Sequence, residues 1–196
     1  MPNLLQKIIV SQLLIVVLTA CANQQTVKNS AFNDANCTAK LAQKAMPNGL
    51  PNMDMNSAIY EVPVNENVSY QELIDSLKSL SEGMNFVNPA NFPIGKNIKA
   101  RGIDPQGIKE VRAFCNLSMG TDIMLDHPEF LVFAPCRIAI YEKPDVNKKL
   151  KLFIAIDRPT FDLKSIKNPT SRAQKAAQQL EDALIELMDK ARRGDI

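Results

Sequence analysis

The sequence predicts an α+β fold, and three observations support this prediction. Short stretches such as 110–115 alternate polar and apolar residues, as half-buried strands do. The segment 68–83 carries the capping and periodicity signals of a helix. A second amphipathic segment closes the chain and ends near Arg192. We therefore expect one α+β domain over residues 57–196, preceded by a signal segment and a tether.

Five strands and three helices make up the predicted domain. The strands are expected at 58–64, 84–88, 110–115, 136–142 and 150–157, and the helices at 68–83, 116–125 and about 170–192. In the first helix Ser69 is the expected N-cap, Glu72 completes a capping box and Gly83 is the expected C′ residue. The last helix begins at Thr170 or Ser171. Its buried stripe repeats every three or four residues: Ala173, Ala176, Leu180, Leu184, Leu187 and Ala191.

Two stretches between these elements lack a regular pattern. Residues 89–107 are rich in Pro, Gly and Asn, so we expect a long loop with at most one helical turn around 96–100. Residues 158–169 are also expected to be irregular. Long loops inside a domain are uncommon unless they are functional. The predicted contact surface therefore comprises residues 89–107 and the segment 120–135.

The first twenty residues read as a targeting segment rather than part of the fold. Lys7 and the amino terminus precede the apolar stretch 8–20, which is short for a membrane span. Leu-Thr-Ala-Cys at positions 18–21 resembles the lipobox of bacterial lipoproteins. This resemblance implies cleavage before Cys21 and lipidation of Cys21, and Ala22 favours the outer membrane. The alternative is an ordinary secretory signal with a chance cysteine.

Composition excludes several classes of function. The net charge is +2, with no Trp and 3 Tyr, so no nucleic-acid partner is expected. The chain has 1 His and no GxSxG motif, which leaves no serine-hydrolase arrangement. No Gly-rich phosphate loop follows a predicted strand. We therefore expect a protein that is not an enzyme.

Four segments resemble the domain-of-unknown-function family 302. They are Tyr60-Glu61-Val62-Pro63, the helix from Ser69, Phe114-Cys115-Asn116, and the run from Pro135 to Glu142 (PCRIAIYE). The resemblance covers roughly residues 57–162 and implies a small antiparallel sheet backed by helices, often dimeric, with no established activity. The loop at 89–107 looks less regular than this family pattern, and the terminal helix looks longer.

The cysteines give the first candidate site. An oxidising envelope compartment permits disulfides, and Cys115 and Cys136 flank a predicted helical crossover. A Cys115–Cys136 bond is our disulfide candidate, and it would contribute about 3 kcal/mol on the chain-entropy model. Cys37, in the predicted tether of residues 21–56, is then free, pairs between chains, or competes for one of the other two thiols.

A metal site is the sharper alternative for the same region. Thiolate, thioether and imidazole groups together favour Cu(I). The candidate ligands lie within 22 residues of each other: Cys115, Met119, Met124, His127 and Cys136. Methionine on a short helix is more often core filler, however, and the spacing matches no paired CxxC zinc pattern. A dithiol–disulfide redox role for Cys115 and Cys136 is the third reading, and it requires one thiol with a lowered pKa.

The sequence thus predicts a lipid-anchored cell-envelope protein that faces the periplasm. Its expected partners are the membrane, through the lipid anchor, and a ligand or protein that the sequence does not identify. A homodimer is also expected from the family resemblance. We expect a non-catalytic binding or interaction module without a resident cofactor. The alternative is copper binding or thiol redox chemistry at Cys115 and Cys136.

Overall fold

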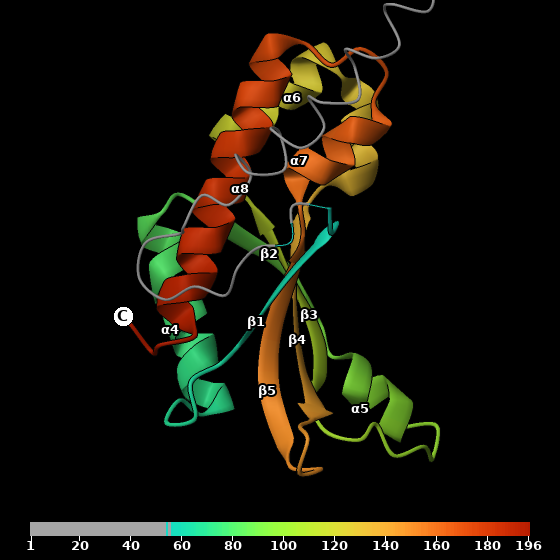
Figure 1. Cartoon of the computed structure of the whole chain (residues 1–196), viewed down its shortest axis with the longest axis vertical. Helices are drawn as coiled ribbons and strands as arrows, with labels where there is room; N and C mark the ends of the chain where they lie inside the picture. Colours follow the sequence, from blue (N-terminus) through green and yellow to red (C-terminus); the bar gives the residue numbers. More distant parts are fainter. Residues whose placement is uncertain (1–53, 55) are drawn as a thin grey trace, which may run out of the picture. The chain divides into compact units, whose positions relative to one another are not determined.

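The computed structural model describes residues 54 and 56–196, and they form a five-stranded antiparallel sheet with helices packed on it (Figure 1). The strand order is β1-β5-β4-β3-β2. The strands are β1 (Ile59–Pro63), β2 (Val87–Phe92), β3 (Lys109–Cys115), β4 (Cys136–Pro144) and β5 (Leu150–Asp157). The helices are α4 (Tyr70–Gly83), α5 (Ile94–Lys99), α6 (Leu117–Asp126), α7 (Pro159–Asp162) and α8 (Ser171–Ala191), with 3-10 turns η1 (Pro128–Phe133) and η2 (Leu163–Ser165). The predicted α+β class with an antiparallel sheet is confirmed.

The core forms where the aliphatic face of the sheet meets α4 and α8. Ile138 lies opposite Ile156 and Ile140 lies opposite Ile154 in the β4–β5 register, and all four side chains are buried. Figure 1 shows α4 and α8 together on one side of the sheet and α5 apart from them. Buried apolar residues extend from Tyr60 to Ala191, so this domain has a hydrophobic core of its own.

Helix α4 begins as its sequence predicts. The Ser69 hydroxyl accepts a hydrogen bond from the Glu72 N–H at 3.2 Å, and the Ser69 N–H donates to the Glu72 carboxylate at 2.7 Å. These two bonds satisfy N–H groups that the first turn of a helix leaves without partners. The end differs from the prediction, because Gly83 is still helical and Asn85 takes the positive φ, 60°.

Helix α8 has Thr170 as its N-cap, with the Thr170 hydroxyl accepting from the Ala173 N–H at 3.1 Å. All six residues of the predicted stripe are buried. One charged residue shares this face, since Glu181 is 1 % exposed and forms an ion pair with Arg158 at 2.7 Å. The Arg158 guanidinium also donates to the Ser57 carbonyl, so this pair connects α8, the end of β5 and the start of the domain.

The two stretches expected to be irregular contain regular elements. Residues 89–107 include most of β2 and all of α5, and residues 158–169 include α7 and η2. The strand predicted at 84–88 is also displaced, because β2 spans Val87–Phe92. The bounds of β2 are set by its pairing with β3 rather than by local strand propensity. Pro89 is tolerated within it because β2 is an edge strand.

The signal peptide predicted at 1–20, Cys21, Cys37 and nearly all of the tether lie outside the described residues. Among the residues that are described, no helix has both the length and the hydrophobicity needed to cross a membrane.

Candidate functional site

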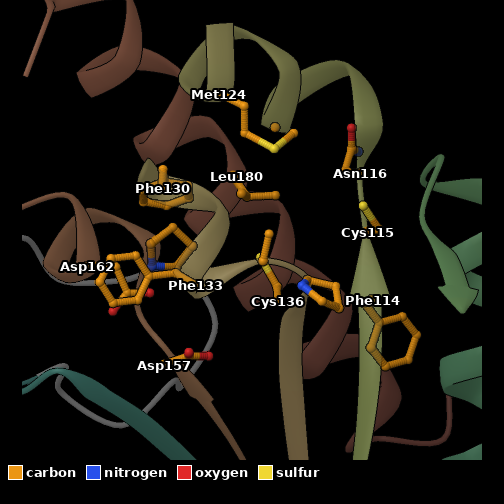
Figure 2. Close-up of a pocket in the computed structure, with 14 residues that line it drawn as sticks. Phe114, Cys115, Asn116, Met124, Phe130, Phe133, Cys136, Asp157, Asp162 and Leu180 are labelled. Carbon is orange, nitrogen blue, oxygen red and sulfur yellow. The ribbon is translucent and has the colours of Figure 1, made fainter. Parts of the chain in front are cut away.

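A small cavity lies at the end of the sheet where β3 stops and β4 starts. Its volume is about 30 Å³. Residues from β3, α6, η1, β4, β5, α7 and α8 contribute to its wall, and Figure 2 shows their side chains near the ends of β3 and β4. The lining includes Cys115, Met124, Phe133, Cys136, Asp157 and Asp162.

Asn116 forms the turn that closes one side of the cavity. It follows the last residue of β3, is 3 % exposed, and accepts a hydrogen bond from the Met119 N–H at 3.2 Å as the N-cap of α6. Its amide group donates to the Met84 carbonyl at 3.4 Å. The predicted cap is therefore confirmed, and it directs α6 back over the end of the sheet.

Cys115 is the last residue of β3 and Cys136 is the first of β4, as the sequence predicts. The register places Phe114, not Cys115, opposite Cys136. Neighbouring residues of a strand point to opposite faces, so the two thiols leave the backbone in different directions. Both are free thiols in the structure, and the disulfide expected from the sequence is not formed.

Burial keeps both thiols protonated. It raises the pKa of Cys136 to about 12, with Asp157 adding to the effect, and it also raises the pKa of Cys115. Reactive cysteines and metal-ligating cysteines need the thiolate form. Arg137 does not supply that charge, because its guanidinium pairs with Asp157 at 2.9 Å and its side chain is half exposed.

The structure brings together three of the five residues proposed as copper ligands. Cys115, Met124 and Cys136 line the cavity, whereas Met119 and His127 are not among its lining residues. Figure 2 shows Met124 reaching toward the cavity from α6, and Cys136 at the start of β4. In residues 54 and 56–196, no three side chains of His, Cys, Asp or Glu are close enough to hold a metal ion.

His127 has a structural role. Its side chain is largely buried, and its Nε2 accepts a hydrogen bond from the Thr170 N–H at 3.0 Å. Its Nδ1 lies 3.5 Å from the Glu129 carboxylate. Because Nε2 accepts, the proton of the neutral ring is on Nδ1. His127 therefore connects the end of α6 to the start of α8, and its Nε2 lone pair is not available to a metal.

Sequence reasoning missed the acidic side of the cavity. Burial, with Asp157 nearby, raises the pKa of Asp162 to about 6, and Arg137 opposes this shift. Asp157 ends β5 and Asp162 ends α7, so they belong to segments that the sequence shows only as a strand end and an irregular stretch. No local pattern marks either residue, since their proximity depends on tertiary packing.

The size of the cavity limits its chemistry. A volume of about 30 Å³ is close to the space of one water molecule, whereas sites for organic ligands are about tenfold larger or more. The wall offers two protonated thiols, one thioether and a carboxyl group that titrates near pH 6. This set can hold a water molecule, but it does not form a pocket for an organic substrate.

The outer side of the same region exposes apolar residues. We define the α6–η1 surface by four side chains that lie on α6 and η1: Leu117, Leu125, Leu131 and Val132. Val132 is 78 % exposed and Leu125 is 69 % exposed. Leu117 and Leu125 lie near the two ends of α6, about 80° apart around its axis. Exposed apolar groups that gather in one place are typical of interaction sites.

Residues 60–189 match the family described as "Domain of unknown function DUF302". A solved structure described as an uncharacterized conserved DUF302 protein from Bacillus stearothermophilus is similar, with a TM-score of 0.59 and 17% sequence identity. The similarity covers 68% of this chain and 98% of that chain. No curated protein matches.

Proposed function

Because the chain belongs to the DUF302 family, whose description assigns no activity, we propose a function from its own residues. The protein is a lipid-anchored component of the cell envelope. Its domain is a non-catalytic binding or interaction module that faces the periplasm. The observation that carries this proposal is the exposed apolar α6–η1 surface.

The anchor is proposed from residues 1–21. The similarity to a lipobox, with Cys21 after the small residue Ala20, supports cleavage and lipidation at this cysteine. Several acyl chains on Cys21 give stable attachment, because each buried methylene contributes about 0.8 kcal/mol. Ala22 supports retention in the outer membrane. A Cys21→Ser protein should remain unprocessed and lose its lipid. Normal processing of that variant would refute the anchor.

The α6–η1 surface is proposed to contact a protein partner. The four exposed apolar side chains of α6 and η1 would lose unfavourable contact with water where a partner covers them. A second copy of this chain is one such partner, as the family resemblance suggests. Light scattering on the purified domain separates a homodimer from a monomer that needs another protein.

Site-specific crosslinking tests the surface in the full-length, lipidated protein. A photoreactive residue at Val132 should give a discrete crosslinked species in cells, and the same residue at Lys175 on α8 serves as the exposed control. The partner captured at Val132 is then identified and purified without the crosslink. Its affinity is measured for the native chain and for the Leu131→Ser/Val132→Ser variant. A loss of about tenfold or more is expected. Equal crosslinking at both positions, or equal affinities, would refute the proposal.

The cysteine-dependent function is retained as a second candidate because Cys115, Met124 and Cys136 share one cavity. It requires thiolates, and the raised pKa values of both cysteines count against it. Titration of the reduced domain with Cu(I) under anaerobic conditions tests it. Stoichiometric binding that is lost in Cys115→Ser/Cys136→Ser would support copper binding. Equal weak uptake by both proteins would exclude it.

A further inference from the structure

The end of the sheet opposite the cavity is formed by two segments that are far apart in sequence. One segment comprises residues 92–107 with α5, and the other comprises residues 144–150, the turn between β4 and β5. The Ile108 N–H donates to the Glu142 carboxylate at 2.9 Å, and a side-chain carbon at Gly107 would meet Leu150 at 3.3 Å. Figure 1 shows α5 beside this turn and away from the other helices. We call these two segments the basic tip.

Helix α5 has a defined conformation without a buried face. None of its six residues is buried, and it approaches β3 through Gly95, where a Cβ would lie 3.4 Å from the Lys109 backbone. A short helix normally depends on burying an apolar stripe, since its own hydrogen bonds stabilise it poorly. Neither isoleucine of α5 belongs to the buried core, and Ile94, which is exposed whereas Ile98 is half-buried, remains available to contact something else.

Both segments of the basic tip expose large apolar side chains. They are Phe92, Ile94, Ile103, Val146 and Leu150. Val146, at the turn, is 97 % exposed and Ile103 is 59 % exposed. Five of the twelve large apolar residues that are exposed in the described part of the chain thus lie on this one end.

The charges on the basic tip are mostly positive. Five basic residues stand against two acidic residues, an excess of three positive charges, in a chain whose net charge is only +2. The basic residues are Lys96, Lys99, Arg101, Lys148 and Lys149, and all are exposed. The acids are used within their own turns: Asp104 accepts from the Gln106 N–H and Asp145 accepts from the Asn147 and Lys149 N–H groups. The exposed charged side chains of the basic tip are therefore five cations and one carboxylate, that of Asp104, while Asp145 is half-buried.

We propose that the basic tip binds the surface of a phospholipid bilayer that contains anionic lipids. Apolar side chains enter the boundary between headgroups and acyl chains, while lysine and arginine side chains pair with anionic headgroups. Both features are required together, because cations alone would bind any polyanion and apolar residues alone would suit a protein interface. This inference depends on α5 and the turn, and it does not depend on lipidation of Cys21 or on the α6–η1 surface.

Vesicle flotation tests the proposal with residues 22–196, which contain the complete core and lack the predicted lipid. The protein should float with vesicles of phosphatidylethanolamine containing about 30 % phosphatidylglycerol. It should not float with phosphatidylcholine vesicles, and salt at about 0.5 M should weaken binding because it screens exposed charges. No flotation with the anionic vesicles, or equal flotation with both, would overturn the proposal and favour a protein ligand for this end.

Two variants and a matched control identify the surface. Lys96→Glu/Lys99→Glu/Arg101→Glu should lower the partition coefficient at least about tenfold, and Ile94→Ser/Ile103→Ser should lower it as well. The control, Lys78→Glu/Lys167→Glu/Lys175→Glu, makes the same change in net charge at exposed positions outside the basic tip. It should retain most of the binding. Equal losses in control and tip variants would overturn the assignment to the basic tip. Circular dichroism verifies that each variant is folded.

Discussion

The two ends of the sheet differ in how far their ionisable side chains are exposed to water. Inside the cavity end, a histidine and an Arg–Glu pair are buried with internal partners, and two thiols are half-buried. At the basic tip, cations and large apolar side chains face solvent, and α5 buries none of its residues. Burial of ionisable groups is costly unless they are paired or neutral, so the first end is constrained by stability. The exposed residues of the basic tip, like those of the α6–η1 surface outside the cavity, are not under that constraint, which leaves them free to serve binding.

Removing the buried carboxylate should have the largest effect. Glu181→Ala leaves the Arg158 guanidinium 3 % exposed and without its counter-ion, and the Thr160 N–H loses its acceptor. We expect the free energy of unfolding to fall by about 3–5 kcal/mol in urea denaturation. The double variant Arg158→Met/Glu181→Leu should recover much of this loss. A cost below about 1 kcal/mol for Glu181→Ala would contradict a structural role for the cavity end.

The next largest effect is expected in the alkylation rate of the Cys136 thiol. With a pKa of about 12, Cys136 has almost no thiolate at pH 8, so alkylation in the folded protein should be roughly a thousandfold slower than in urea. Both cysteines should label in urea without prior reduction, since both are free thiols. Mass spectrometry of the labelled peptides measures each rate. Rapid labelling of folded Cys136, or labelling only after reduction, would restore the redox or disulfide interpretation.

Sequence patterns within three or four residues predicted the helix caps and the α8 stripe well. Contacts between segments far apart in the sequence left no such pattern. The Ser69–Glu72 box, the Asn116 cap and the α8 stripe depend on residues three or four apart, and the structure confirms them. Strand β2 depends on β3, which begins 17 residues after β2 ends, so the sequence placed it wrongly. The charged member of the buried α8 face, Glu181, and its partner Arg158, 23 residues away, were not predicted from the sequence.

The candidate site was predictable only in part for the same reason. Cys115 and Cys136 were placed correctly at strand ends, but their register, one residue out of alignment, cannot be read from spacing. His127 was proposed as a ligand because its imidazole lies within 22 residues of thiolate and thioether groups, and it instead accepts from the Thr170 N–H, 43 residues away. Asp157 and Asp162 join the cavity through the packing of α7, which the sequence did not reveal.

Asp162 should make the cavity end sensitive to pH. Burial raises its pKa from 3.8 to about 6, so the folded state resists its ionisation and loses stability as pH rises from about 4 through 6. Asp162→Asn removes this cost. Allowing for its partial exposure, the variant should be about 1–2 kcal/mol more stable than the native chain at pH 7 and equal to it near pH 3.5. Urea denaturation at both pH values measures the difference. A variant that is less stable at pH 7 would contradict the assignment.

Changes at the basic tip should have the smallest effect on stability. Ile94→Ser/Ile103→Ser alters two large apolar side chains, yet both are exposed and α5 contributes none of its residues to the core. We expect the free energy of unfolding to change by less than about 0.5 kcal/mol. Leu184→Ala, a similar loss of aliphatic carbon on the buried face of α8, should cost about 2–5 kcal/mol and serves as the comparison. If the α5 variant cost as much as the α8 variant, the apolar residues of the tip would be part of the fold. If its stability is unchanged while membrane binding is lost, those residues are present for binding rather than for folding.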